Sequence, residues 1–304
     1  MRRAIISGAT GAIGTALTKE LVQHDVEVLI LVRRNSERIR NIIHHPLVNI
    51  KYCALDELEQ IQNETGKSYD VFYHFAWAGA AGPGRNDMYL QNQNIRYALD
   101  AVGAAKRFGC SIFIGAGSQA EYGRTEGVLK PETSVNPEMG YGYAKLCAGY
   151  MTRDYAGQLG LRHIWTRILS VYGPNDGSQS MVMSTIHKLR NGETPQFTKG
   201  EQMWDYLYSA DAARAFYLIG EKGINERTYV LGSGKVRPLA DYIRDIRDVV
   251  KPGAALAMGA IPYSEKQVMY LQADITELWQ DVGFEPQIEF VEGIKLMTDS
   301  IGDF

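Results

Sequence analysis

Short runs of apolar and β-branched residues alternate with longer segments of helical periodicity over roughly the first 170 residues. Most of these runs are apolar on both faces, which is typical of parallel strands that helices cover on both sides. Strand–helix–strand alternation predicts an α/β fold built on a doubly wound parallel sheet. The predicted strands are 4–7, 26–32, 50–53, 71–75, 111–115 and 163–168, and the predicted helices are 15–24, 87–108 and 140–159.

The alternation ends after Tyr172-Gly173-Pro174, where glycine and proline begin to interrupt the chain. A short helix at 210–219 and a strand at 228–231 are expected to return to the main sheet. We therefore expect a main domain of residues 1–170, with 209–232 folding back onto it. The remaining segments, 171–208 and 233–304, are expected to form a smaller, irregular C-terminal lobe.

Composition and charge narrow the classes of protein. The chain has 304 residues, of which 45% are hydrophobic and 22% charged, and its formal net charge is −3. These values exclude a collagen-like or broadly disordered chain. The chain also lacks the excess positive charge that binds nucleic acid or an anionic membrane. No apolar run approaches the ~20 residues that cross a bilayer. The cysteines Cys53, Cys110 and Cys147 form no disulfide framework or metal site, so we expect a cytoplasmic protein without a metal.

A glycine triplet follows the first predicted strand and opens the first predicted helix. Its spacing is Gly8-x-x-Gly11-x-x-Gly14. Glycines let a backbone turn tightly and approach a pyrophosphate at the positive end of a helix. This context predicts a dinucleotide site, with Thr10 and Ile13 among its contacts. The alternative is a turn that only packs the helix closely on the sheet.

The end of the second predicted strand indicates which dinucleotide binds. An acidic residue there would accept hydrogen bonds from the adenosine ribose. This chain instead has Arg33 and Arg34, and two guanidinium groups suit the 2′-phosphate of NADP. NADP is therefore favoured over NAD. In the alternative interpretation, both arginines are simply solvated.

Tyr141 and Lys145 are four residues apart, so they share one face of a predicted helix. A neighbouring ammonium and a cationic nicotinamide would both favour the phenolate and make the phenol a usable acid or base. With 18 tyrosines in the chain, such a pair also arises by chance. Its setting adds weight, because Ser118 leaves the carboxyl end of a central strand, where open α/β sheets bind ligands. Taken alone, Ser118 could equally stabilise a turn.

These motifs together resemble an extended short-chain dehydrogenase/reductase of the nucleotide-sugar epimerase/dehydratase group. The similarity covers nearly the whole chain, and the ordered set of motifs is more specific than any single one. The matching segments are Gly8-x-x-Gly11-x-x-Gly14, Asp56, His74-Phe75-Ala76, Asn94-Ile95, Ser118, Tyr141-x-x-x-Lys145, Arg167 with Val171-Tyr172-Gly173-Pro174, Asp205-Tyr206-Leu207-Tyr208-x-x-Asp211, and Gly283-Phe284-x-Pro286 with Glu292-Gly293-Ile294.

The resemblance implies a Rossmann domain and a smaller lobe that binds the nucleotide of a sugar substrate. It implies Tyr141 as the acid/base, Lys145 as the residue that holds the nicotinamide ribose and tunes Tyr141, and Ser118 as a second hydrogen-bond donor. It also implies a homodimer formed through two helices per subunit. Further cofactor contacts are implied for Asp56, Phe75, Ala76 and Asn94.

Two departures from the family pattern narrow the chemistry. Dehydratases of the family carry an Asp-Glu pair where this chain has Gln119 and Ala120, so dehydration is disfavoured and Gln119 is expected to face the substrate. On a strand-like path Glu121 would face the other way. The family often has arginine at the position of Trp204, and Arg237 is a candidate to replace its charge.

The two tryptophans near these segments each have two interpretations. Trp204 stacks on a base or sugar, or it anchors the small lobe. Trp77, directly after the fourth predicted strand, either forms a wall against the substrate or packs without contacting it.

The leading prediction is an NADP(H)-dependent reductase of a nucleotide-activated 4-keto-deoxysugar, with the proton supplied by Tyr141. The first alternative is an NAD-dependent nucleotide-sugar 4-epimerase that uses the same three residues. The second is a catalytically silent, cofactor-sensing protein on the same fold. The presence of Ser118, Tyr141 and Lys145 together argues against a silent protein.

Overall fold

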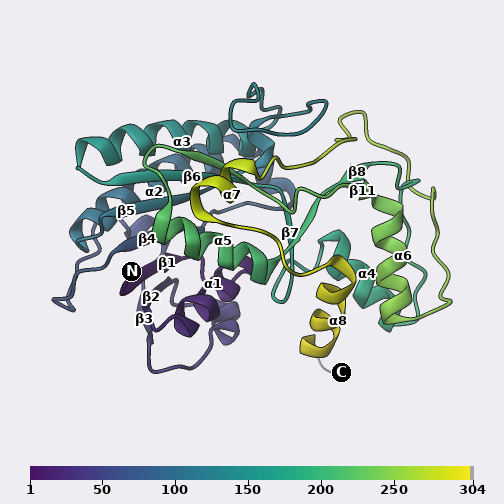
Figure 1. The fold of residues 1–304 in the computed structure, drawn as a ribbon, viewed down its shortest axis with the longest axis horizontal. Helices are drawn as coiled ribbons and strands as arrows, with labels where there is room; N and C mark the ends of the chain where they lie inside the picture. Colours follow the sequence, from purple (N-terminus) through teal and green to yellow (C-terminus); the bar gives the residue numbers. More distant parts are fainter. Residues whose placement is uncertain (302–304) are drawn as a thin grey trace.

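The computed structural model describes residues 1–301, so the last residues of the predicted lobe, 302–304, lie outside it. In the described chain a seven-stranded sheet has the order β10-β6-β5-β4-β1-β2-β3, and all of its pairings are parallel. This confirms the predicted doubly wound, Rossmann-type sheet (Figure 1). The strands are β1 (Arg3–Ser7), β2 (Glu27–Val32), β3 (Val48–Tyr52), β4 (Val71–His74), β5 (Ile112–Ser118), β6 (Arg162–Ile168) and β10 (Thr228–Leu231).

Helices cover both faces of this sheet (Figure 1). On one face lie α1 (Ala12–Gln23) and α5 (Ser209–Lys222), and on the other lie α2 (Met88–Arg107) and α3 (Gly140–Gln158). Strand residues alternate between the two cores because successive side chains point to opposite faces. Thus Ala4 and Ile6 of β1 pack in the α1/α5 core, whereas Ile5 packs in the α2/α3 core. The uninterrupted apolar runs 4–6 of β1 and 28–32 of β2 are explained by this two-sided burial.

The order in which strands are added to the sheet reverses at β1, which pairs with β2 on one side and with β4 on the other. The connections leaving β1 and β4 therefore diverge, and a crevice opens at the carboxyl ends of these strands. In the sheet register Ser7 lies opposite His74, His74 opposite Gly115, and Ser118 opposite Ile168. The carboxyl ends of β1, β4, β5 and β6 therefore lie side by side.

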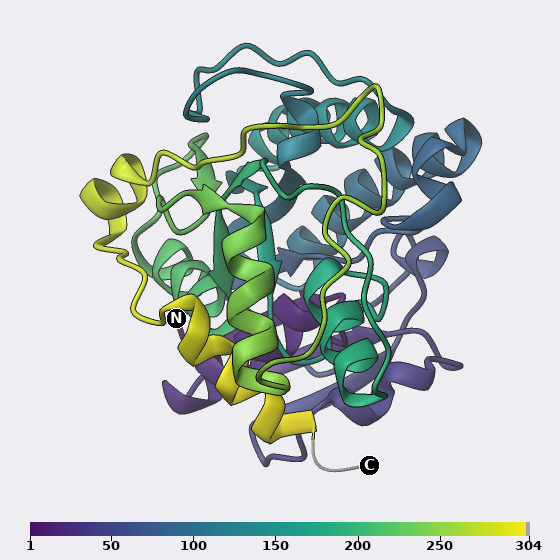
Figure 2. The ribbon, with the colours of Figure 1, turned by 90° about the vertical axis from the view of Figure 1, so that its right-hand side faces the viewer.

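Beyond residue 174 the chain is more regular than its glycines and prolines predict. Three outer helices that the sequence analysis did not expect, α4 (Met181–Arg190), α6 (Leu239–Val250) and α8 (Phe290–Ile301), pack together at one end of the molecule (Figures 1 and 2). Two of the residues that interrupt the sequence pattern lie at helix ends: Pro238 is the N-cap of α6, and Gly192 follows α4.

The rest of this half consists of shorter elements. They are β7 (Ser170–Tyr172), β8 (Met203–Trp204), β9 (Tyr206–Tyr208), β11 (Arg237–Pro238) and α7 (Thr276–Val282). Single 3₁₀ turns occur earlier in the chain at η1 (Glu37–Asn41), η2 (Leu55–Glu57), η3 (Gly82–Asn86) and η4 (Gln119–Glu121). None of the helices within residues 1–301 is long and apolar enough to cross a membrane.

Two buried carboxylates join distant segments of this half. Asp205, which is completely buried, accepts hydrogen bonds from the backbone N–H groups of Ser233, Gly234 and Ala273 at 2.7–3.0 Å, and from the Ser233 hydroxyl at 2.7 Å. Asp211 accepts bonds from the N–H groups of Gln287 and Ile288. Each carboxylate satisfies several buried donors that would otherwise lack a partner.

We expect Asp205→Ala to lower the free energy of unfolding by about 2–4 kcal/mol, because it leaves buried N–H donors unsatisfied. Urea unfolding followed by circular dichroism measures this change. Asp241→Ala, which removes an exposed carboxylate of α6 paired with Arg244, is the matched control and should leave the midpoint nearly unchanged. Equal midpoints for the two variants would contradict the role assigned to Asp205.

Candidate active site

A cleft of about 460 Å³ lies at the carboxyl ends of β1, β4, β5 and β6. It brings together residues that the sequence analysis selected from four separate segments. Those that line it are Gly8, Gly11, Ile13, Gly14, Phe75, Trp77, Ser118, Gln119, Tyr141 and Lys145. A second hollow, of about 540 Å³, lies against α2 and α3 between Asp100 and Tyr155, and none of the predicted site residues lines it.

The glycine loop packs closely against the backbone around it at the mouth of the cleft. Gly8 has a φ of +81°, and a Cβ there would lie 2.6 Å from the backbone nitrogen of Ala76. A Cβ on Gly14 would lie 2.4 Å from the carbonyl oxygen of Gly8. Among residues 1–301 no side chain caps the first turn of α1, and that turn contains no acidic residue. Its N–H groups therefore face the cleft as an anion site, which fits the pyrophosphate of a dinucleotide.

Ser118, Tyr141 and Lys145 meet in this cleft. Lys145 lies one turn after Tyr141 on α3, and its Nζ is 5.7 Å from the centroid of the Tyr141 ring. Burial raises the pKa of Tyr141, and the neighbouring Ser118 hydroxyl lowers it. Ser118 is the last residue of β5, the strand beside β4. Its hydroxyl therefore lies at the carboxyl ends of the strands, on the same side of the sheet as the glycine loop. The three polar groups are those that proton transfer to a bound carbonyl oxygen requires.

Lys145 is almost completely buried, at 3% exposure. Its Nζ donates a hydrogen bond to the carbonyl oxygen of Ala116 at 2.6 Å and lies 3.7 Å from the centroid of the Trp77 ring. Burial lowers the pKa of Lys145 to about 7, because water no longer solvates the ammonium. The indole of Trp77 also meets the Tyr141 ring edge-on, and its N–H is fixed by Gln91 at 2.8 Å. Trp77 is therefore part of the wall around Tyr141 and Lys145.

A buried ion pair behind the cleft fixes Ser118. Glu121 is fully buried and accepts hydrogen bonds from the Ser118 backbone N–H at 2.8 Å and from Arg167 Nε at 2.8 Å. The Trp165 indole donates a third bond at 3.1 Å. Residues 119–121 follow a 3₁₀ turn and not the strand-like path expected, so the turn is what directs Glu121 away from the cleft and Gln119 into it.

Other predicted cofactor contacts lie around the glycine loop. Asn94 is buried and bonds both the N–H and the carbonyl of Ala78, at 2.9 Å each, so it holds the loop after β4 in place. The Ala76 backbone packs against Gly8. Thr10 and Asp56 are not part of the cleft lining.

The two arginines after β2 are exposed. Arg34 lies over the ring of Tyr52, with its guanidinium carbon 5.5 Å from the ring centroid. Neither Arg33 nor Arg34 forms an ion pair with a carboxylate of the described chain. Both guanidinium groups are therefore available to an anionic ligand.

Trp204 and Arg237 lie one layer behind the cleft. The Trp204 indole donates a hydrogen bond to Ser170 at 2.8 Å, and it is Ser170 that lines the cleft. Arg237 pairs with Trp204 across β8 and β11, and its guanidinium bonds Asp245 at 2.9 Å. The cleft also contains Arg85 and Asp176, which sequence reasoning missed because they lie in loops without a recognisable motif.

We expect Glu121→Gln to lower the free energy of unfolding by about 3 kcal/mol, because it leaves the guanidinium of Arg167 buried without a counter-charge. Chemical denaturation measures the loss. The control is Glu138→Gln, which removes one partner of the exposed Arg124–Glu138 pair and should leave the midpoint unchanged. Similar midpoints for both variants would show that the buried pair does not stabilise this turn.

The chain matches one family model and is similar to several known proteins. The family model "NAD dependent epimerase/dehydratase family" matches residues 4–232. CDP-abequose synthase of Salmonella typhimurium is 23% identical over 298 residues, which cover 96% of this chain and 95% of that protein.

Solved structures share the fold over almost the entire chain. The UDP-N-acetylglucosamine 4-epimerase from Methanobrevibacter ruminantium M1, in complex with UDP-N-acetylmuramic acid, has a TM-score of 0.88 and 23% identity, covering 99% of this chain and 98% of its own. The UDP-glucuronic acid 4-epimerase from Bacillus cereus, in complex with UDP-glucuronic acid and NAD, has a TM-score of 0.85 and 19% identity, covering 98% of each chain. The chain therefore belongs to the NAD-dependent epimerase/dehydratase family, a group of extended short-chain dehydrogenase/reductase enzymes that use a nicotinamide cofactor.

Proposed function

We propose that the enzyme is an NADP(H)-dependent reductase of a nucleotide-activated 4-keto-deoxysugar. The observation that carries the proposal is the convergence of Ser118, Tyr141 and Lys145 beside the glycine loop, without a carboxylate at 119 or 120. Gln119 and Ala120 cannot remove a proton from carbon and expel water, so dehydration is disfavoured. The likeness to CDP-abequose synthase extends over nearly the full length of both chains and supports a nucleotide-linked sugar as substrate.

In this proposal a bound nicotinamide supplies a hydride to the carbonyl carbon of the sugar. Tyr141 donates its phenolic proton to the carbonyl oxygen, so that hydride and proton together convert the C=O group to an alcohol. Ser118 donates a hydrogen bond to the same oxygen and stabilises the negative charge that develops there. Lys145, next to Tyr141 on α3, is placed to hold the cofactor ribose and to return the phenol to its acidic form.

NADP is the cofactor we propose, because Arg33 and Arg34 are exposed after β2 and have no carboxylate partner within residues 1–301. The guanidinium groups suit a phosphate monoester. NAD remains the alternative, and the Bacillus cereus epimerase of the same fold was solved with NAD.

A 4-epimerase is the second candidate, because two solved structures of high similarity are 4-epimerases. The same three side chains would take the proton from the sugar hydroxyl and later return it, while a bound NAD would accept hydride from the carbon and return it to the opposite face of the sugar. Such an enzyme keeps its nicotinamide tightly bound between the two half-reactions, whereas a reductase exchanges it. Cofactor that co-purifies with the protein would therefore favour the epimerase. The grouping of all three polar residues in one cleft argues against a catalytically silent protein.

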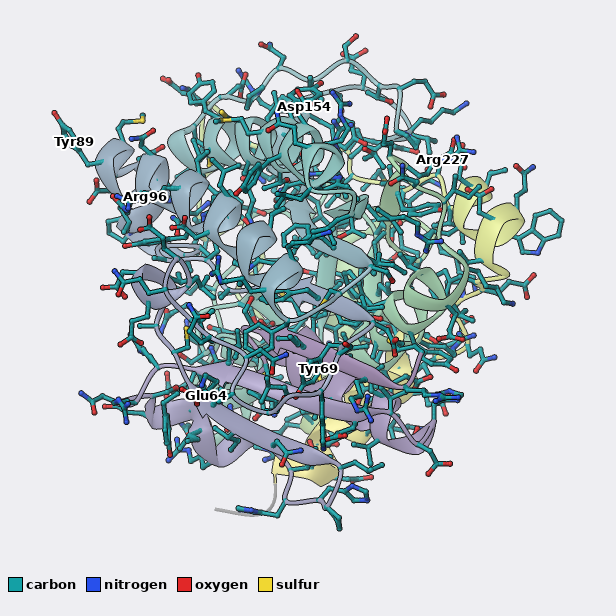
Figure 3. The ribbon with its side chains drawn as sticks, turned by 90° about the vertical axis from the view of Figure 1, so that its left-hand side faces the viewer. Glu64, Tyr69, Tyr89, Arg96, Asp154 and Arg227 are labelled. Carbon is teal, nitrogen blue, oxygen red and sulfur yellow. The ribbon has the colours of Figure 1, made fainter. Side chains whose placement is uncertain are left out.

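We also propose a homodimer formed through α2 and α3. These helices carry exposed apolar side chains at Met88, Tyr89, Tyr143, Tyr150 and Met151. Tyr89 is 91% exposed and projects from α2 in Figure 3. The two helices pack against each other, and exposed apolar residues on neighbouring helices are typical of an interaction surface. The sugar nucleotide is proposed to bind between the strand ends and the segments 171–208 and 233–304.

We expect Tyr141→Phe to lower turnover about 10²–10⁴-fold, because it removes the proton donor, with little change in cofactor affinity. Loss of NADPH absorbance across a panel of nucleotide-linked ketosugars measures turnover. Tyr143→Phe, on the exposed side of the same helix, is the matched control. Unchanged turnover in Tyr141→Phe would contradict the proposal, and interconversion of UDP-sugars without NADPH consumption would favour the epimerase.

Arg33→Ala should raise the dissociation constant for NADPH about tenfold or more, through loss of a charged contact to the 2′-phosphate. The dissociation constant for NADH should change little, and it serves as the internal control. Fluorescence titration measures both constants. Equal weakening of the two cofactors would refute a phosphate role for Arg33.

A further inference from the structure

Arg85 lies in the active-site cleft, but neither the proposed chemistry nor the family motifs use it. It belongs to the 3₁₀ turn η3 after β4 and is half-buried. Its guanidinium carbon is 4.4 Å from the centroid of the Tyr141 ring. That distance is shorter than the 5.7 Å between the same centroid and Lys145 Nζ. A guanidinium this close to an aromatic face is attracted to it.

The segment that carries Arg85 is fixed to the start of α3. The side chain of Gln91 donates a hydrogen bond to the Gly84 carbonyl at 2.8 Å. Asn86 accepts a bond from the Gly140 N–H at 3.2 Å, and Gly140 is the first residue of α3. Arg85 is therefore flanked on both sides by residues with fixed contacts, and one of these contacts holds the residue next to Tyr141.

No carboxylate in residues 1–301 forms an ion pair with Arg85. The Arg85 guanidinium donates a long hydrogen bond, of 3.4 Å, to the Ala80 carbonyl. The positive charge next to Tyr141 is therefore not neutralised by a neighbouring side chain.

We propose, on the basis of the function proposed above, that Arg85 is a positioning residue for Tyr141, because its guanidinium lies on the face of the phenol ring and supplies a permanent positive charge that stabilises the phenolate. The role differs from that of Lys145, which also faces the ring. Lys145 is buried and its pKa is lowered to about 7, so its amine loses charge as the pH rises past neutrality. A guanidinium stays protonated over the whole range in which a phenol ionises.

The other groups that face this pair act in different directions. Burial and Glu121 on η4 raise the pKa of Tyr141, whereas the Ser118 hydroxyl of β5 and Arg85 lower it. His74 of β4 lies near Lys145 and is neutral, because burial lowers its pKa to about 3. Of the charged groups near the ring, Arg85 is thus the one whose charge both persists and favours the phenolate.

The test is the ionisation of Tyr141 in the NADP⁺ complex without substrate. The tyrosinate absorbance of each protein, minus that of the same protein carrying Tyr141→Phe, isolates this phenol. Removing a half-exposed unit charge a few ångströms away should raise the midpoint by about one pH unit in Arg85→Gln. Arg85→Lys keeps a charge and should recover most of the original midpoint. Arg244→Gln removes an exposed charge from α6 and should have no effect.

The pH profile of kcat/KM gives a second readout. In the direction of reduction Tyr141 acts as an acid, so the high-pH fall in rate should move upward in Arg85→Gln by the same amount. An unchanged Tyr141 midpoint in a folded Arg85→Gln protein would overturn the proposal. A rise in KM for anionic substrates, without a change in the Tyr141 midpoint or in the midpoint of the pH profile, would also overturn the proposal. Arg85 would then be a residue that binds the substrate. A shifted midpoint without consumption of any ketosugar would support Arg85 and contradict the reductase instead.

Discussion

Lys145 places an amino group in a part of the protein from which water is largely excluded, and the rest of the site is arranged around it. The Ala116 carbonyl and the face of Trp77 replace its water shell, and the Tyr141 ring lies one helical turn before it. An amine in such surroundings is held in one position but is less strongly charged. The phenol beside it therefore needs further sources of positive charge. A bound cofactor would supply one when its nicotinamide is oxidised, and Arg85 is placed to supply another.

The fold brings these groups together through the sheet. Because β1 lies between β2 and β4, the crevice opens where the glycine loop, Trp77 and Ser118 leave their strands. Ser118 is then held from behind by the buried pair of Glu121 and Arg167. Ser118 is thus positioned by a buried ion pair whose two side chains do not line the cleft.

The sequence was sufficient to predict the sheet, because the uninterrupted apolar runs 4–6 of β1 and 28–32 of β2 are a strong signal for two-sided burial. It was also sufficient to select Ser118, Tyr141 and Lys145, which lie together in the cleft. The outer helices α4, α6 and α8 were missed because glycine and proline near them suggested irregular structure, although Pro238 and Gly192 lie at helix ends. Arg85, and Glu121 as a support for Ser118, were missed because their roles depend on turns that no local pattern predicts.

The most direct test of the central claim is to follow the hydride itself. NADPH carrying deuterium at nicotinamide C4, prepared separately in each stereochemical form, would be incubated with a nucleotide-linked 4-ketosugar, and the sugar product analysed by mass spectrometry and NMR. Net reduction by this cleft predicts one deuterium on the former carbonyl carbon from one of the two cofactor forms. A product without deuterium from either form would contradict the account.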